Sequence, residues 1–288
     1  MDFLSDRAWL WIATAFYAIA FATSTISMVR SKGRSRGLML ALVVAGAAFQ
    51  TTGLYLRGLE AGGCPVRNIF EVVQFVIWSA TILYLVVGTA FRVSLLGYFT
   101  SGLAVVLSIV SLSIPGWDVA TRPPVFSGVA WIEVHASLGL FAYGAFGTLA
   151  LTSLMFLLQT FSLKHKHVRG LFAFLPSIVA LEQINYRLLL TGLVVLTVSI
   201  VAGGYYYSQD PDSISGMKLV IATAVWFAYL IVLTLRLRRV LVSGALAWSC
   251  LALFGFALFS LGLITRPRST VETVAGGAAL SAEAEITP

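Results

Sequence analysis

Long apolar stretches alternate with short polar segments along the whole chain. Eight stretches of 17 to 30 residues contain no Asp, Glu, Lys or Arg. A helix of about 20 apolar residues crosses a hydrocarbon core about 30 Å thick. The pattern therefore predicts an all-α fold, a polytopic membrane helical bundle of about eight transmembrane helices. The predicted spans are 8–29, 37–56, 72–91, 93–117, 134–163, 188–209, 219–235 and 240–265.

The composition changes the range of possible functions. Hydrophobic residues make up 59% of the chain and charged residues 11%, whereas a soluble domain carries about 25% charge. Together with the mean hydropathy of +0.92, this composition excludes a water-soluble enzyme. The net charge of +7 does not indicate a nucleic-acid partner, because the basic residues lie in loops, where they set membrane orientation. Membrane lipid is the partner that this composition implies.

Positive charge is distributed unequally between two sets of loops. Twelve Lys and Arg residues lie in the first, third, fifth and seventh loops, and seven lie on the opposite side with eleven of the twelve acidic residues. Because loops rich in Lys and Arg stay in the cytoplasm, we predict that both termini are extracytoplasmic. We expect a multi-pass protein of the bacterial cytoplasmic membrane, with the first span kept as an uncleaved helix.

Two further features carry little chemistry. The run 170–181 is apolar but interrupted by Pro176 and too short to cross the membrane, so it predicts a cytoplasmic amphipathic helix. Cys64 is expected on the outer side and Cys250 inside the eighth span, too far apart for a disulfide. The absence of a Cys-x-x-Cys pair disfavours a thiol-redox or zinc function.

The first candidate site residues lie at the outer end of the third span. Glu71 follows Asn68 by three residues, and Trp78 lies inside the span. Asn and Glu at this spacing are typical of a capping box, in which Asn68 accepts a hydrogen bond from a helix amide and Glu71 complements the positive helix end. The alternative is that Glu71 and Trp78 belong to an outer binding site.

A second group opens the fifth span. Trp131, Glu133 and His135 occur within five residues, and Tyr143 follows His135 by eight residues, near the same helix face. An ionisable side chain at this depth is costly and usually faces a protein interior or a cavity. His135 is therefore either a metal or cofactor ligand or a structural hydrogen-bonding group.

A third group is aromatic and lies where the sixth span ends and the seventh begins. It forms either an interfacial belt of aromatic side chains or an apolar platform for a flat macrocycle, and periodicity does not choose between them. The group consists of the run from Gly203 to Asp210, which contains Tyr205, Tyr206 and Tyr207, and of Met217, Lys218, Trp226 and Tyr229.

Three segments between residues 40 and 265 resemble the cytochrome c assembly superfamily of haem-handling membrane proteins that includes CcsA, ResC and CcmC. The matching positions are Gln50, Leu54, Arg57, Gly58, Pro65, Asn68, Glu71, Phe75 and Trp78 in the first segment, Trp131, Glu133, His135, Tyr143, Gln159, Lys164, Leu175, Pro176, Ser177, Leu181, Glu182, Asn185, Tyr186 and Arg187 in the second, and Gly203, Lys218, Trp226 and Arg236 in the third.

The resemblance implies an outward-facing haem site, because in that family an outer Trp-rich loop cradles haem and histidines on flanking helices are its axial ligands. This chain departs from the family pattern. Residues 215–217 replace the Trp-Asp-Pro triplet, and His135 alone remains of four histidine positions, with Gln50, Thr234 and Ile264 at or near the others. These departures resemble the HemX-like branch, which is associated with control of haem biosynthesis and with cytochrome assembly.

The histidine count limits haem coordination independently. Two axial imidazoles must reach one iron from opposite faces, and the chain has three histidines. At 1.5 Å per residue, His165 and His167 lie about 45 Å along a helix from His135. We therefore expect either haem ligation by His135 as the single histidine, beneath the tyrosines 205–207, or a haem contact without coordination. Any second ligand would be weaker, such as Met217 or a tyrosine, or would come from a partner or a second copy of the chain.

Further polar residues are candidates for contact with the haem propionates. Glu71, Glu133, Asp210 and Lys218 form the predicted outer polar ring. Arg57 or Arg67 is the expected charge partner, because Arg binds carboxylates bidentately.

We predict an integral membrane protein of cytochrome c biogenesis and haem handling that contacts haem at the extracytoplasmic face with a degenerate Trp-rich motif. The alternative is a HemX-type membrane regulator of tetrapyrrole biosynthesis without haem relay. A transporter is disfavoured, because charged groups or broken helices near mid-membrane are missing. We expect no enzymatic activity, because no nucleophile is paired with a base.

The expected organisation has three parts: a first transmembrane helix with its basic cytoplasmic loop (1–36), a cytochrome c assembly-like transmembrane domain (37–265) and a disordered polar tail (266–288). None of the outer loops is long enough to fold alone. Besides haem, we therefore expect a partner, another cytochrome c assembly membrane protein with an extracytoplasmic domain.

Overall fold

The computed structural model describes residues 6–29, 36–90, 94–119, 130–164, 177–209, 216–241 and 243–264. The described residues form eight α-helices and one short 3-10 helix and contain no strand, which confirms the all-α prediction. The elements are α1 (Asp6–Val29), α2 (Arg36–Ala61), α3 (Ile69–Ala90), α4 (Ser94–Ser113), η1 (Pro115–Asp118), α5 (Ala130–Lys164), α6 (Ile178–Gln209), α7 (Gly216–Leu237) and α8 (Ser243–Ile264).

The helices have the length and composition of membrane spans. Seven of those described are long and apolar enough to cross a bilayer, and α8 contributes a shorter apolar segment, Gly244–Leu258. The prediction of a polytopic membrane bundle is confirmed. The extracytoplasmic placement of both termini stays a prediction from the charge distribution.

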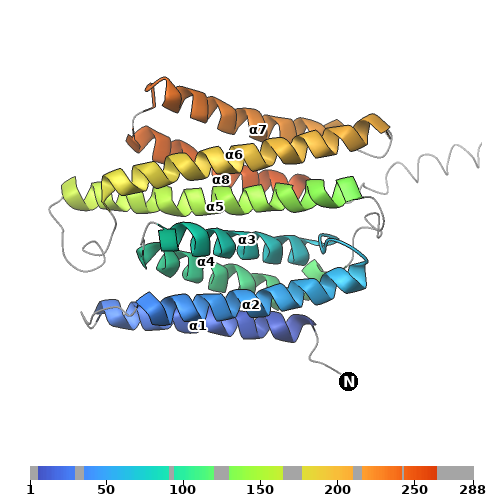
Figure 1. The fold of residues 1–288 in the computed structure, drawn as a ribbon, viewed down its shortest axis with the longest axis horizontal. Helices are drawn as coiled ribbons and strands as arrows, with labels where there is room; N and C mark the ends of the chain where they lie inside the picture. Colours follow the sequence, from blue (N-terminus) through green and yellow to red (C-terminus); the bar gives the residue numbers. More distant parts are fainter. Residues whose placement is uncertain are drawn as a thin grey trace, which may run out of the picture.

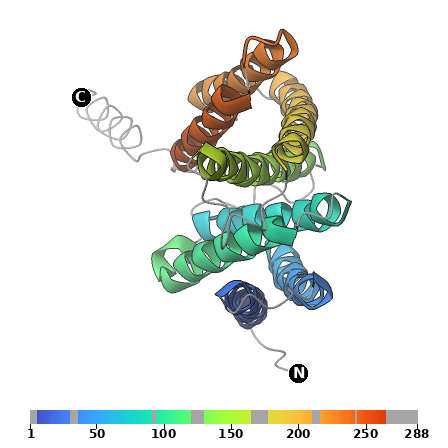
Figure 2. The ribbon, with the colours of Figure 1, turned by 90° about the vertical axis from the view of Figure 1, so that its left-hand side faces the viewer.

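The eight helices are arranged as two rings of four that lie side by side (Figures 1 and 2). In the first ring, α1 and α3 each contact both α2 and α4. In the second ring, α5 and α7 each contact both α6 and α8. The rings meet mainly where α3 and α4 pack against α5. Residues far apart in the sequence are therefore brought together at the helix ends.

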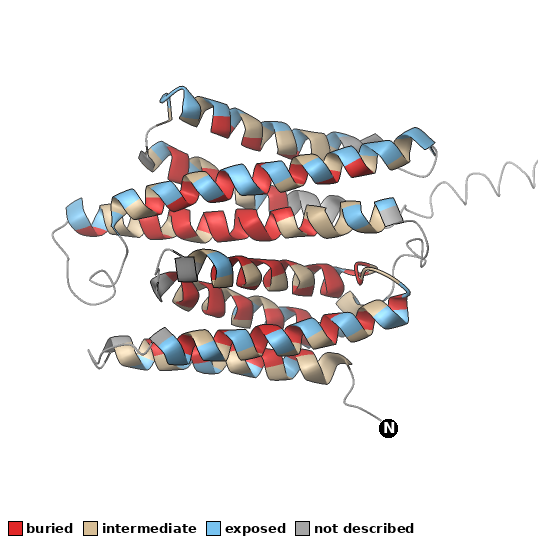
Figure 3. Ribbon diagram, in the orientation of Figure 1, coloured by how far each residue is buried: buried red, intermediate tan, exposed pale blue. Residues whose placement is uncertain are grey.

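Helix α5 is the central element of the molecule (Figure 3). In the most apolar part of α5, 78% of the residues are buried within the protein. The corresponding share in α7 is 22%. Small residues permit this close packing, because a Cβ atom at Gly144 would overlap the Cβ of Ser79 on α3. Such small-residue contacts are typical of membrane helices that approach closely.

Local signals explain where several helices begin and end. Gly62 ends α2 with a φ of 69°, a conformation that glycine adopts without strain. The amide of Gly62 donates to the oxygen of Leu59, and that of Gly63 donates to the oxygen of Gly58, as in a Schellman motif. At the other end of the bundle, the hydroxyl of Ser177 accepts a hydrogen bond from the amide of Ala180 at 3.2 Å and caps α6.

The predicted amphipathic helix at 170–181 is partly wrong. Residues 178–181 form the first turn of α6, which begins ten residues before the predicted sixth span. The preceding part of that prediction, up to residue 176, lies outside the described residues. The predicted fourth span is also too long, because α4 ends at Ser113 and Pro115 begins a separate 3-10 helix.

Candidate functional site

His135 lies in the second turn of α5, half-buried against α6. Its Nδ1 atom is 2.7 Å from the backbone oxygen of Ser199 and 3.2 Å from the Ser199 hydroxyl. That hydroxyl donates a hydrogen bond to the backbone oxygen of His135 at 2.8 Å. Ser199 is 1% exposed, so water does not compete for these contacts. The imidazole is therefore fixed on α6.

Gly203 lies one turn along α6 from Ser199 and provides space for the imidazole. A Cβ atom at Gly203 would lie 2.5 Å from Nδ1 and 2.7 Å from Cε1 of His135, whereas a Cβ at Gly204 would meet nothing within 4 Å. Gly203 is the first residue of the third predicted group and one of the positions of family resemblance, whereas no pattern in the sequence points to Ser199. Their spacing of four residues places both on one helix face, but that spacing does not identify the helix that the face contacts.

A tryptophan–tyrosine pair lies one turn nearer the predicted outer ends of α5 and α6 than His135. The rings of Trp131 and Tyr205 have centroids 5.1 Å apart and planes inclined by 60°, an edge-to-face arrangement. Trp131 is 52% exposed and Tyr205 49% exposed. Of the predicted site residues, His135, Trp131 and Tyr205 are thus brought to the same end of one helix pair.

The remaining members of the aromatic group have different surroundings. Tyr206 and Tyr207 are half-buried near the end of α6. Trp226 on α7 donates its Nε1 hydrogen to the hydroxyl of Thr197 at 2.8 Å. Met217 and Lys218 belong to the first turn of α7, and their side chains lie outside the described residues. The contribution of Met217 as a second iron ligand stays a prediction.

Glu133 faces a different part of the protein from His135. Its carboxylate occupies the space beside Gly63, in the connection between α2 and α3, where a Cβ atom on Gly63 would overlap it. In the same connection, Cys64 accepts a hydrogen bond from the hydroxyl of Ser137 at 3.2 Å. Burial raises the pKa of the Cys64 thiol; the bond from Ser137 opposes this rise, and the charges of Glu133 and Glu71 add to it. A thiol that stays protonated at neutral pH is a poor nucleophile.

Glu71 caps the first turn of α3, as the local pattern predicted. Its amide donates to the Asn68 side-chain oxygen at 2.8 Å, and its carboxylate accepts from the amide of Arg67 at 2.6 Å. Trp78 donates its Nε1 hydrogen to the hydroxyl of Thr51 at 2.8 Å. Glu71 and Trp78 therefore make structural contacts in the first ring, whereas His135 lies in the second.

The guanidinium of Arg57 is enclosed by three carboxylates at the same end of the first ring. It binds Asp118 bidentately, at 2.7 and 2.8 Å, contacts Glu71 at 3.2 Å and pairs with Asp6. Its central carbon lies 4.4 Å from the centroid of the buried Phe70 ring. The structure therefore does not support Arg57 as a partner for haem propionates, because its donors already serve protein carboxylates.

Comparison with known proteins identifies the family. The family model described as cytochrome C assembly protein matches residues 66–265 of this chain. The chain belongs to the cytochrome c assembly protein family. This membership confirms the resemblance that the sequence motifs indicated.

Individual relatives support both branches of the predicted resemblance. The chain is 28% identical over 201 residues to protein HemX of Brevibacillus brevis, an alignment that covers 69% of this chain and 74% of HemX. It is 27% identical over 157 residues to cytochrome c biogenesis protein CcsA of Trichormus variabilis, covering 52% of this chain and 44% of that protein. With CcsA of Microcystis aeruginosa it shares 26% identity over 238 residues, covering 64% and 70% of the two chains. This member of the family thus spans less than half of the Trichormus CcsA.

In this cytochrome c assembly protein, Gln50 takes part in a buried hydrogen-bond chain through the first ring. Its side-chain oxygen accepts from the Tyr17 hydroxyl at 2.8 Å, and its amide donates to the side-chain oxygen of Gln74 at 3.0 Å. Gln74 donates in turn to the hydroxyl of Ser111 at 2.8 Å. The chain links α1, α2, α3 and α4, so Gln50 has a structural role in the present fold.

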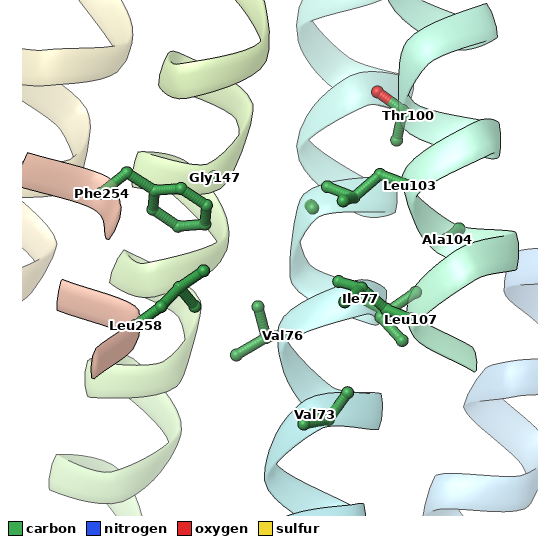
Figure 4. A pocket seen from close by; sticks show the side chains of 11 residues that line it. Val73, Val76, Ile77, Thr100, Leu103, Ala104, Leu107, Gly147, Phe254 and Leu258 are labelled. Atoms are coloured by element: carbon green, nitrogen blue, oxygen red, sulfur yellow. The ribbon is translucent and has the colours of Figure 1, made fainter. Parts of the chain in front are cut away.

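An apolar cavity of about 110 Å³ lies where the two rings meet (Figure 4). It is enclosed by α3 and α4 on one side and by Gly147, Phe254 and Leu258 on the other. Thr100 is its single lining residue with a polar side-chain group. The cavity offers no iron ligand or charged group and lies about 18 Å along α5 from His135, at 1.5 Å per residue, so it is separate from the candidate haem contact. The described residues also contain no group of three or more His, Cys, Asp or Glu suited to a metal ion.

Proposed function

We propose that this member of the family acts in cytochrome c biogenesis by contacting haem at the extracytoplasmic face through His135. The observation that carries the proposal is the fixed imidazole of His135 at the end of α5, with the Trp131–Tyr205 pair one turn further out. Such a site combines a candidate iron ligand with exposed aromatic surface. These are the two kinds of group that a metal-bearing apolar macrocycle requires.

Haem supplies an iron with open axial positions in a flat apolar ring that carries two propionates, and imidazole is a common axial ligand. The described residues fit this group as a contact at the surface. His135 would hold the iron, and the exposed rings of Trp131 and Tyr205 would cover part of the macrocycle. Because the apolar cavity lies between the two rings, we propose that haem contacts the predicted outer ends of α5 and α6.

This chain provides one imidazole for the site. His165 and His167 come after α5 in the sequence, outside the described residues, and the end of α5 at Lys164 lies about 44 Å along the helix from His135, at 1.5 Å per residue. Gln50 is held in the buried chain with Tyr17. A second strong ligand would therefore come from another protein. We propose that the partner is a cytochrome c assembly membrane protein with an extracytoplasmic domain, located with this chain in the bacterial cytoplasmic membrane.

The similarity to HemX over 69% of this chain favours a second candidate function. In that case the protein regulates tetrapyrrole biosynthesis and relays no haem, as the resemblance to the HemX-like branch implies. Deletion of the gene separates the two functions. Loss of covalent c-type cytochromes supports the biogenesis role, whereas normal cytochromes with altered levels of precursor enzymes support the regulatory role.

Haem titration of the purified protein in detergent tests the contact directly. We expect a Soret shift on binding, and we expect His135→Ala to change the position of the band because the axial nitrogen is lost. His167→Ala is the matched control, because it also removes one imidazole but at a position 32 residues further along the sequence. A His135→Ala spectrum identical to that of the wild type would reject axial ligation by His135.

A further inference from the structure

We infer that Ser199 and Gly203 hold His135 in the tautomer that carries its proton on Nδ1 and leaves Nε2 as the ligand atom. The inference deepens the proposed function and rests on it only for the identity of the ligand, haem iron. Ser199 and Gly203 are then positioning residues, which act through the imidazole and do not touch the haem themselves.

The hydrogen-bond partners determine which nitrogen carries the proton. The backbone oxygen of Ser199, 2.7 Å from Nδ1, can only accept a hydrogen bond, so Nδ1 must donate. The Ser199 hydroxyl donates its hydrogen to the His135 backbone oxygen and therefore also faces Nδ1 as an acceptor. A neutral imidazole has one N–H group, so Nε2 carries the free electron pair.

The other nitrogen is available for a ligand. Nε2 has no hydrogen-bond partner among the described residues, whereas Nδ1 has two possible acceptors on a single residue. Histidines that bind metals usually donate their second ring N–H to a backbone carbonyl or carboxylate, which fixes the tautomer and the ring orientation. His135 has this arrangement, with the backbone oxygen of Ser199 as the acceptor.

Gly203 determines how closely the ring can approach α6. With a Cβ atom only 2.5 Å from Nδ1, alanine at this position would push the ring away from the Ser199 oxygen. The adjacent Gly204 has open space at its Cβ position. The pair Gly203→Ala and Gly204→Ala thus compares two identical substitutions in one helix, of which only the first disturbs the imidazole.

Nitrogen-15 NMR of histidine-labelled protein in detergent, without haem, reads the tautomer. The three histidines are assigned by comparison with His135→Gln. We expect the wild type and Gly204→Ala to show a protonated Nδ1 and a bare Nε2 at His135, and Gly203→Ala to lose this form. A wild-type spectrum with the proton on Nε2 would overturn the inference, and this measurement remains decisive even if Gly203→Ala fails to fold.

Haem titration of the same variants tests the consequence. We expect Gly203→Ala to weaken haem binding by about 10-fold to 100-fold, the usual effect of losing the group that orients a metal-binding histidine, and Gly204→Ala to bind as the wild type does. Equal affinity in the two variants would overturn the positioning role. If the wild type has the expected tautomer but binds no haem, the proposed function fails while the tautomer assignment stands.

Discussion

At the scale of single residues, charged side chains at one end of the first ring are stabilised by one another. Arg57 has 9% of its side chain exposed and contacts three carboxylates. Asp118 also accepts a hydrogen bond from Arg7 at 3.0 Å. Removing one partner of a buried ion pair leaves the other charge without compensation, which costs about 3–5 kcal/mol.

Arg57→Gln should therefore destabilise the protein strongly. The substitution leaves Asp6, Glu71 and Asp118 close together without their central cation, so we expect a loss of about 3–5 kcal/mol. Thermal unfolding in detergent measures this as a midpoint lowered by on the order of 10 °C. Arg238→Gln is the control, because Arg238 is exposed and surface substitutions usually stay within about 0.5 kcal/mol. Equal midpoints in the two variants would contradict a stabilising role for the network.

The sequence predicts contacts between residues only when they are close along the chain. Asn68 and Glu71 are three residues apart, so the helix itself brings them together and a capping pattern is sufficient. Arg57 and Asp118 are 61 residues apart, and His135 and Ser199 are 64 apart. Their pairing depends on which helices are neighbours, and no local pattern contains that information.

At the scale of elements, α6 shows why hydropathy placed a helix correctly but misjudged its start. The segment before residue 188 contains Glu182, Asn185 and Arg187, which interrupt the apolar run. In the structure Asn185 is 3% exposed and Glu182 pairs with Arg236 of α7. The partner of Glu182 on α7 compensates its charge, so the helix extends beyond its apolar part.

The contact between α3 and α5 depends on a glycine. Gly144→Ala places a Cβ atom against the Cβ of Ser79 and 3.0 Å from the amide nitrogen of Ala80. Because backbone cannot move aside as a side chain can, we expect a loss of about 1–3 kcal/mol, typical of overpacking. The thermal midpoint of the detergent-purified protein measures it.

Gly255→Ala supplies the matched comparison in α8, because a Cβ atom there meets nothing within 4 Å. Alanine is favoured over glycine in a helix by up to about 1 kcal/mol, so this variant should be as stable as the wild type or more stable. A Gly144→Ala variant as stable as Gly255→Ala would show that the two rings can separate slightly at no cost.

At the scale of the whole molecule, the sequence predicts the number of spans but not the two rings. Each span is apolar on nearly every side, so periodicity does not distinguish the central α5 from the peripheral α7. In the structure, 78% of the residues in the most apolar part of α5 are buried, compared with 22% in α7. The position of His135 between α5 and α6 follows from that arrangement, and the ring pattern therefore determines which residues can surround the site.

Membrane orientation decides whether the proposed site faces the compartment where cytochromes c are assembled. In a variant with Cys64→Ser and Cys250→Ala, we expect a cysteine introduced by Ser208→Cys to react with a membrane-impermeant maleimide on intact spheroplasts. A cysteine introduced by Arg238→Cys should react only after permeabilisation.

Both positions are exposed, and they lie at opposite ends of the second ring, because Ser208 is near the end of α6 and Arg238 follows α7. The excess of Lys and Arg on the Arg238 side predicts that this side is cytoplasmic. The reverse labelling pattern would put His135 near the cytoplasmic surface, and an extracytoplasmic haem contact through this residue would then be impossible.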